Sequence, residues 1–210
     1  MNNTVSFNGQ VAQDYFVRKM CKEKRNGTFV EIGTNDPIYY NNSYRLEKEL
    51  DWRGILVECD TQYGPLYTEH RPKSISILQD ATTINYRNEF EKANLPKDID
   101  YLQIDLVVDN NSTLTTLENI VTQCMPEYTF GVITFEHDIY RGDFFNTRKI
   151  SRELFKANGY ERVFSDVKHN GNAFEDWYVH PKLIDISLYK DIQSDKSLEY
   201  TDIIKILNTL

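Results

Sequence analysis

The sequence predicts an α/β protein built on a mostly parallel sheet. Short runs rich in β-branched and aromatic residues alternate with helical segments, which is the pattern of parallel strands joined by crossover helices. The length of 210 residues, with 40% hydrophobic and 27% charged residues, fits one domain with its own core. The same composition excludes collagen-like and wholly disordered chains. We therefore expect a single globular domain over residues 1–210.

The N-terminal segment, residues 1–27, is predicted to be helical. Val11, Tyr15 and Met20 are apolar positions in a polar setting, which indicates an amphipathic helix. Gly27 follows a run of charged residues and is expected to end that helix.

Five strands are predicted in the first part of the core, whose full extent is residues 28–180. Pro37 stops any helix directly after the first strand. Ser112 is expected to cap a helix, because its hydroxyl can accept a free backbone N–H of the first turn. The predicted strands are 28–33, 54–58, 74–78, 101–106 and 129–135. The predicted helices are 43–50, 61–70 (helical or irregular, interrupted at Pro65), 88–93 and 113–124.

At the end of the core the alternation of strands and helices stops, because two predicted strands follow each other without a helix between them. A helix at 147–158 carries Gly159 in the position just past its end. The strands at 160–164 and 177–180 then predict an antiparallel hairpin that completes a seven-stranded sheet with helices on both faces. The apolar spacing in 187–210 predicts a C-terminal helical appendage.

Charge and cysteine content restrict the partners. The net charge of −8 argues against nucleic acid and anionic membranes as partners, and it favours a neutral or cationic small ligand. The sequence has no apolar run of about 18 residues and no signal peptide, so we expect a cytoplasmic protein. Cys21, Cys59 and Cys124 are expected to be reduced, buried thiols. Oligomeric state stays open.

Acidic residues follow every parallel strand. Ligands of parallel sheets bind outside the carboxyl ends of the strands, so this row of carboxylates marks the predicted site. The acidic residues at these ends are Glu31, Glu58, Asp80, Asp105, Glu136 and Asp138.

The residues at the ends of the first three predicted strands predict a nucleoside-binding site. A carboxylate at the end of the second strand, here Glu58, can accept both ribose hydroxyls, and Gly33 lets the backbone approach the ligand. Asp80 is placed to accept from an adenine amino group. Only one glycine is present where a dinucleotide site has three, so a ligand with adenosine but no phosphates fits better than NAD.

The motif Glu31-x-Gly33-x-Asn35, with Glu58 and the Ile104-Asp105 strand end, resembles the FkbM-type class I S-adenosylmethionine methyltransferases over residues 28–180. The stretches 134–143 and 174–181 resemble the short sugar 2-O-methyltransferases of large chlorella viruses. The resemblance implies a Rossmann-like fold with S-adenosylmethionine bound by Glu31, Gly33, Thr34, Asn35, Glu58 and Asp80. It also implies 2-O-methylation of a deoxysugar such as rhamnose.

Two departures from that family affect the site. Pro37 replaces the last glycine of the first loop, and Leu106 and Val107 follow Asp105 where a Glu-Gly pair is usual. A general base placed just after the fourth strand therefore cannot be carried over from the family.

Deprotonation of a sugar hydroxyl requires a general base, a divalent cation, or both. We expect Asp105, Glu136 and Asp138 to hold Mg²⁺ or Mn²⁺, because these are hard oxygen ligands, and His137 to take the proton. Asp105 and His137 are thus the predicted catalytic residues. The residues expected to line the acceptor pocket are Arg141, Asp143, Trp177 and Tyr178.

The leading hypothesis is a sugar O-methyltransferase that acts on a small-molecule or oligosaccharide acceptor. Two alternatives remain open from the sequence. One is a noncatalytic module that binds an adenosine ligand or serves in assembly, and the other is an NAD-dependent oxidoreductase.

Overall fold

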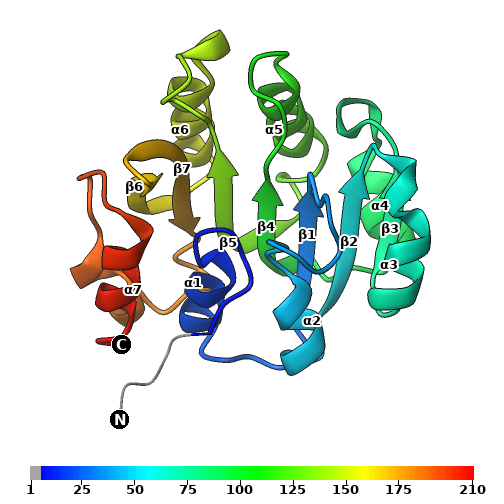
Figure 1. The fold of residues 1–210 in the computed structure, drawn as a ribbon, viewed down its shortest axis with the longest axis horizontal. Helices are drawn as coiled ribbons and strands as arrows, with labels where there is room; N and C mark the ends of the chain where they lie inside the picture. The colour runs from blue at the N-terminus through cyan, green and yellow to red at the C-terminus, as the bar shows by residue number, and fades with distance from the viewer. Residues whose placement is uncertain (1–5) are drawn as a thin grey trace.

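A computed structural model describes residues 6–210, which form a seven-stranded sheet (Figure 1). The strand order is β3-β2-β1-β4-β5-β7-β6. Strands β1 to β5 are parallel, whereas β7 runs antiparallel to both β5 and β6. The mostly parallel sheet with an antiparallel C-terminal hairpin is thereby confirmed. The strands are β1 Thr28–Ile32, β2 Arg53–Glu58, β3 Ile75–Leu78, β4 Asp98–Ile104, β5 Thr129–Glu136, β6 Glu161–His169 and β7 Asn172–Val179.

Helices cover both faces of the sheet and divide the core into two clusters. One cluster packs β-strand residues against α4, α5 and α6, and the other packs them against α1, α2, α3 and α7. Within β1, Val30 and Ile32 belong to the first cluster and Phe29 to the second, as the alternation of strand side chains requires. The helices are α1 Gln13–Met20, α2 Tyr44–Leu50, α3 Gly64–His70, α4 Tyr86–Lys92, α5 Ser112–Gln123, α6 Thr147–Ala157 and α7 Tyr200–Leu207.

Three helix boundaries differ from the sequence predictions. Helix α1 ends at Met20, seven residues before Gly27, and the ring of Trp52 fills the space beside that glycine. Pro65 does not interrupt a helix but stands in the first turn of α3, where its missing N–H costs nothing. Ser112 is itself the first residue of α5, and the Asn110 side chain accepts its N–H at 3.0 Å.

The end of α6 agrees with the prediction. Gly159 has a φ of +85° directly after the C-cap residue Asn158, and its N–H donates to the carbonyl of Lys156 at 3.1 Å. The hairpin that follows is longer than predicted, because β6 and β7 extend to a tight turn at residues 170–171.

The C-terminal segment is only partly helical. Residues 186–188 and 190–192 form 3₁₀ turns, and the segment reaches a regular helix only at α7. Residues 194 and 199 also make isolated parallel bridges to β6, so this segment lies along the edge of the sheet. Across residues 6–210, no helix combines the length and apolar character that a membrane crossing needs.

Candidate functional site

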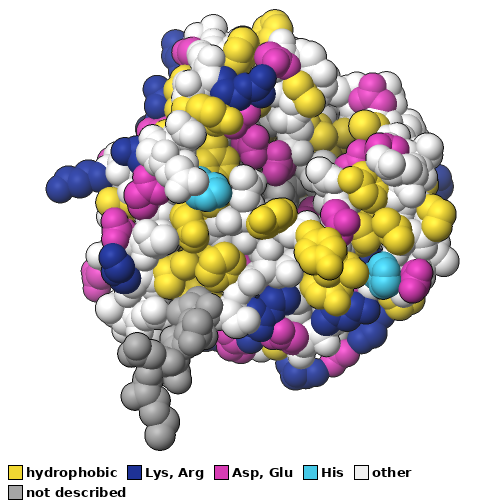
Figure 2. Space-filling model, viewed as in Figure 1, with side chains coloured by type: hydrophobic (Ala, Val, Ile, Leu, Met, Phe, Trp, Pro, Cys, Tyr) yellow, Lys and Arg dark blue, Asp and Glu magenta, His cyan; other side chains and the backbone are white. Residues whose placement is uncertain are grey.

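The carboxyl ends of β1, β2, β4 and β5 meet at one edge of the sheet, at the top in Figure 1. The chain passes from β1 to β2 on one side and later returns to β4 on the other, so the β1/β4 boundary is the switch point where ligands of open α/β sheets bind. A cleft of about 780 Å³ lies there. Figure 2 shows acidic side chains gathered around a hollow on this face, with hydrophobic side chains beside it.

The cleft brings together most of the predicted site residues. Six of its lining residues are acidic, and one further lining residue, Arg141, is an arginine. The predicted residues that line it are Glu31, Gly33, Thr34, Asn35, Glu58, Asp105, Glu136, Asp138 and Arg141.

Gly33 forms the closest approach between two strand ends. Its φ is +83°, and a Cβ built there would lie 1.7 Å from the backbone oxygen of Asp105. Its N–H donates to the carbonyl of Val57 at 3.0 Å, which ties the end of β1 to β2. Any other residue would have to separate β1 from β4, so glycine is a geometric requirement at the centre of the cleft.

Glu58 stands at the end of β2 with part of its carboxylate engaged by backbone. One oxygen accepts the N–H of Asn35 at 2.8 Å, and the other accepts the N–H of Asp60 at 2.9 Å. These contacts fix the carboxylate at the cleft and leave lone pairs on both oxygens for a ligand. Thr34 is buried, and its hydroxyl donates to the carbonyl of Glu31 at 3.1 Å.

Two predicted cofactor residues have other partners. The Glu31 carboxylate is buried and accepts the N–H of Asn42 at 3.0 Å and the hydroxyl of Ser43. Burial raises the pKa of Glu31, and the guanidinium of Arg71 opposes that rise. Asp80 does not line the cleft; its carboxylate accepts the N–H of Thr82 at 2.9 Å and begins a 3₁₀ turn. The adenine contact of Asp80 therefore stays a prediction that this geometry does not favour.

Asp105 and Glu136 are neighbouring carboxyl groups at the carboxyl ends of the adjacent strands β4 and β5. Burial raises the pKa of Asp105 to about 6, while its hydrogen bond with Glu136 opposes the rise. Burial and the neighbouring Asp105 raise the pKa of Glu136 well above its usual value. Ionisation of Asp105 thus disfavours ionisation of its buried neighbour Glu136.

The predicted metal ligands Asp105, Glu136 and Asp138 do not form a compact set of ligand atoms. Among residues 6–210, one set of three histidine, cysteine or acidic side chains has ligand atoms all within 4.8 Å of one another, and that set is His137, Asp166 and Asp176. Asp105, Glu136 and Asp138 share the cleft without forming such a set. Asp138 is instead engaged by Arg141, whose Nη1 lies 3.3 Å from its carboxylate. These carboxylates therefore do not fit a preformed Mg²⁺ or Mn²⁺ site.

His137 points away from the cleft. Its side chain is fully buried, and its Nε2 lies 3.5 Å from both Asp166 and Asp176. Its Nδ1 accepts the N–H of Ile139 at 3.3 Å. Glu136 and Asp138 do face the cleft while His137 faces the other way, as the strand alternation predicted. This geometry does not favour His137 as the general base, because a base must reach a ligand in the cleft and the His137 side chain is buried behind it.

Arginine supplies the positive charge beside His137. Arg152 donates to Asp176 at 2.6 Å and lies 3.0 Å from Asp166, and Arg148 also lies 3.0 Å from Asp166. Although burial opposes it, Arg152 and His137 hold the pKa of Asp176 well below its usual range. This partly buried network joins α6 to the hairpin of β6 and β7 and surrounds His137, the neighbour of Asp138.

Three predicted acceptor residues and one cysteine lie elsewhere than expected. Trp177 is fully buried and stacks on Phe16 with a centroid distance of 4.8 Å, so it belongs to the core. Tyr178 is buried on the opposite face, and Asp143 is exposed outside the cleft. Cys21, Cys59 and Cys124 are free; Cys124 is buried as predicted, whereas Cys21 is half-buried and Cys59 is exposed at the cleft.

Sequence reasoning missed the buried cation that supports the first loop. The Arg71 side chain has no exposed surface and pairs with Glu47 at 2.9 Å. It also donates to the carbonyl of Pro37 at 3.2 Å and to Asn41 Oδ1 at 2.7 Å. Arg71 thus fixes the loop between β1 and α2 from beneath. The only sequence signal was an arginine in a helix-ending position, which does not distinguish a buried residue from an exposed one.

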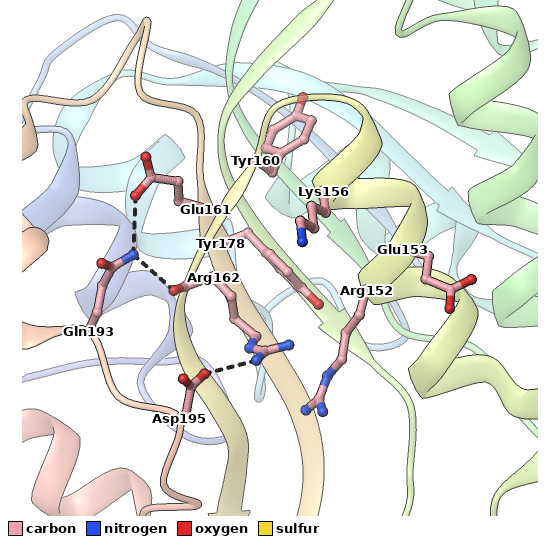
Figure 3. A pocket seen from close by; sticks show the side chains of 9 residues that line it. All are labelled: Arg152, Glu153, Lys156, Tyr160, Glu161, Arg162, Tyr178, Gln193 and Asp195. Carbon is pink, nitrogen blue, oxygen red and sulfur yellow. Dashed lines mark hydrogen bonds and ion pairs between the residues drawn. The ribbon is translucent and has the colours of Figure 1, made fainter.

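A second cavity of about 460 Å³ lies between α6 and the edge strand β6 (Figure 3). Arg152 and Lys156 face it from α6, and Arg162 donates to Asp195 at 2.9 Å across it. Three basic and three acidic residues line it, so its charge is balanced. It shares no lining residue with the cleft.

Comparison with known proteins gives a structural match but no sequence match. No protein-family model matches the sequence, and no curated protein matches it significantly. The structure is similar to an O-methyltransferase from Bacillus cereus in complex with SAH, with a TM-score of 0.57 and 15% identity over 86% of this chain and 84% of that one. It is also similar to a TehB-like SAM-dependent methyltransferase from Corynebacterium glutamicum, with a TM-score of 0.53 and 12% identity over 85% and 89% of the two chains. The strand order, the antiparallel C-terminal pair and these similarities together show that the chain has the Rossmann-like methyltransferase fold.

Proposed function

We propose that this protein is an S-adenosylmethionine-dependent O-methyltransferase whose acceptor is a carbohydrate hydroxyl. The observation that carries the proposal is the cleft at the β1/β4 switch point, where Gly33 leaves room for a ligand and Glu58 presents a carboxylate. The acidic lining suits a cationic cofactor and disfavours one that carries phosphates. The structural neighbours named above support the same cofactor class.

The residues of the cleft fit that cofactor. Glu58 is available to the ribose hydroxyls, and the backbone from Gly33 to Asn35 lies beside it. The carboxylates near Asp105 complement a positive charge. S-adenosylmethionine, when bound, supplies a methyl group on a positively charged sulfur.

We assign the role of general base to Asp105. An ionised carboxylate at the cleft can accept the proton of an acceptor hydroxyl, and the raised pKa of about 6 makes Asp105 a stronger base than an ordinary aspartate. Glu136, whose pKa is raised by burial and by Asp105, is the neighbouring carboxyl group at the end of β5. This assignment replaces His137, which the structure buries away from the cleft.

The finer features come from the resemblance described above. We propose a deoxysugar such as rhamnose as the acceptor, methylated at the 2-hydroxyl, and we place the protein in the cytoplasm. Neither nucleic acid nor membrane is a partner in this proposal, because the cleft is lined by six acidic residues.

Calorimetric titration tests the cofactor first. We expect saturable binding of S-adenosylmethionine, no binding of NAD, and unchanged binding in excess EDTA. Glu58→Ala is expected to weaken S-adenosylmethionine about tenfold or more, because the ribose hydroxyls lose a charged acceptor. Asp60→Ala, an exposed neighbour outside the cleft, is the matched control.

Mass spectrometry with methyl rhamnosides then tests turnover. A product heavier by one methyl group supports the enzyme. Cofactor binding without any product, across a panel of sugar acceptors, would instead favour the noncatalytic binding module. NAD binding in place of S-adenosylmethionine would favour the oxidoreductase.

A further inference from the structure

Two exposed tyrosines stand at the mouth of the cleft. Tyr39 and Tyr40 lie in the loop between β1 and α2, and both line the cleft. Their exposed fractions are 73% and 75%. Two adjacent exposed aromatic rings beside a polar cleft form an apolar patch of the kind that marks ligand-binding grooves.

The backbone beneath these rings holds an unfavourable conformation. Tyr40 has a φ of +56°, in the left-handed region that bulky side chains rarely adopt. The N–H groups of Ile38 and Tyr39 both donate to Asp36 Oδ1 at 2.8 Å, which forms a tight turn just before Tyr40. Such strain persists only where the surroundings impose it, and it is found most often at ligand-binding positions.

The surroundings do impose this conformation. Gly9 forms a parallel bridge with Tyr40, and the Asn8 side chain donates to the carbonyl of Asn41 at 3.0 Å. A Cβ on Gly9 would lie 2.2 Å from Asn42 Oδ1, so the two segments pack with no spare room. Arg71 supports the same loop from inside the protein. The two rings are therefore presented by a rigid support, which lowers the entropy lost when a ligand binds.

The cleft next to these rings offers the complementary chemistry. The carboxyl groups of Asp105, Glu136 and Asp138 can accept or share hydrogen bonds with hydroxyl groups but repel anions. A ligand that satisfies both parts has an apolar face for the rings and several hydroxyls for the carboxylates, and it carries no phosphate. A neutral sugar ring has this combination.

We propose that Tyr39 and Tyr40 form the acceptor subsite and stack on the apolar face of a neutral sugar ring. This inference rests on the proposed function, and it adds residues that place the acceptor hydroxyl near Asp105. The tyrosines act as positioning residues that contact the acceptor but take no part in proton transfer.

The test compares variants that lose an aromatic ring with variants that keep it. Acceptor binding is measured by saturation-transfer NMR and titration with methyl α-L-rhamnoside, in the presence of saturating S-adenosylhomocysteine. We expect Tyr39→Ala and Tyr40→Ala each to raise the acceptor Kd about fivefold or more, whereas Tyr39→Phe and Tyr40→Phe stay within about twofold. Ile186→Ala is the matched control, because Ile186 is an exposed apolar residue that does not line the cleft.

Cofactor titration separates the two proposals. Failure of the wild-type protein to bind S-adenosylmethionine would overturn the proposed function itself. Intact cofactor binding with an unchanged acceptor Kd in both alanine variants would overturn only the acceptor subsite. A loss of S-adenosylhomocysteine affinity in the alanine variants would show that the rings contact the cofactor, and binding of catechol in place of the rhamnoside would show a phenolic acceptor. Either result overturns the inference.

Discussion

Asp105 and Glu136 place two carboxyl groups in the cleft where we propose that an acceptor hydroxyl loses its proton. Burial raises both pKa values, and the neighbouring Asp105 raises that of Glu136 further. Two chemically similar groups thereby take different roles, as is common where burial and a like-charged neighbour act together.

Methyl transfer is expected to rise with pH through about 6, because only the ionised form of Asp105 accepts a proton. A pH–rate profile under saturating cofactor checks this inflection. In Asp105→Asn we expect kcat to fall by about a hundredfold or more, with the inflection lost. The inflection is expected to persist in His137→Gln; if it disappears there and remains in Asp105→Asn, the base is His137.

Gly33→Ala is expected to lower the free energy of unfolding by about 2 to 4 kcal/mol, because the new Cβ meets the Asp105 backbone. Gly171→Ala provides a matched control, since Gly171 has the same φ of +83° with nothing within 4 Å. That control is expected to cost about 1 kcal/mol from backbone strain alone. Urea denaturation of both variants measures the difference, and equal losses would contradict the close approach.

At the scale of elements, the loop from β1 to α2 depends on a buried ion pair. Arg71 at the end of α3 joins Glu47 of α2 to the carbonyl of Pro37, and all three residues are buried. A buried pair of this kind contributes little net stability when intact but leaves an uncompensated charge when one partner is removed. The site therefore depends on α2 and α3, neither of which lines it directly.

Arg71→Met is expected to lower the free energy of unfolding by about 3 to 5 kcal/mol, because Glu47 keeps a buried charge without its partner. The double variant Arg71→Met/Glu47→Met is expected to recover part of that loss. Arg25→Met removes an exposed pair with Asp51 and is the control, with no measurable change expected. Thermal and urea unfolding measure all three, and a double variant less stable than Arg71→Met would argue against this account.

Across the whole molecule, acidic residues outnumber basic ones, and the lining of the cleft shares this excess. The chain carries a net charge of −8, and six acidic residues line the cleft. The resulting field favours cationic ligands and is screened by salt over about 8 to 10 Å at physiological ionic strength. The molecule as a whole thus contributes to ligand choice.

Binding of S-adenosylmethionine is expected to weaken with salt more than binding of S-adenosylhomocysteine, because only the former carries a sulfonium charge. Raising NaCl from about 0.05 M to about 0.5 M is expected to reduce the ratio of the two affinities about threefold or more. Calorimetry at both salt concentrations checks it. A ratio that stays constant would mean that the acidic cleft does not select the cofactor by charge.

Local sequence patterns were enough to predict the strands, their order along the chain and the acidic residues at their ends. These are local properties: apolar periodicity, turn residues such as Gly159, and the carboxylates that follow each strand. The antiparallel hairpin also followed from local pattern, because two strands without an intervening helix cannot be joined in parallel. The errors in this part, at Gly27, Pro65 and Ser112, concern where a helix begins or ends.

Which side chains lie together could not be predicted without the folded structure. His137 and Trp177 have sequence neighbours suited to a site, yet strand alternation and the packing of α1 and α6 bury both. Arg71 and Tyr40 carried no distinguishing pattern, because a buried ion pair and a left-handed tyrosine depend on segments distant in sequence. Side-chain burial is set by the whole fold, whereas strand and helix formation is set largely by neighbouring residues, and the functional cleft depends on both.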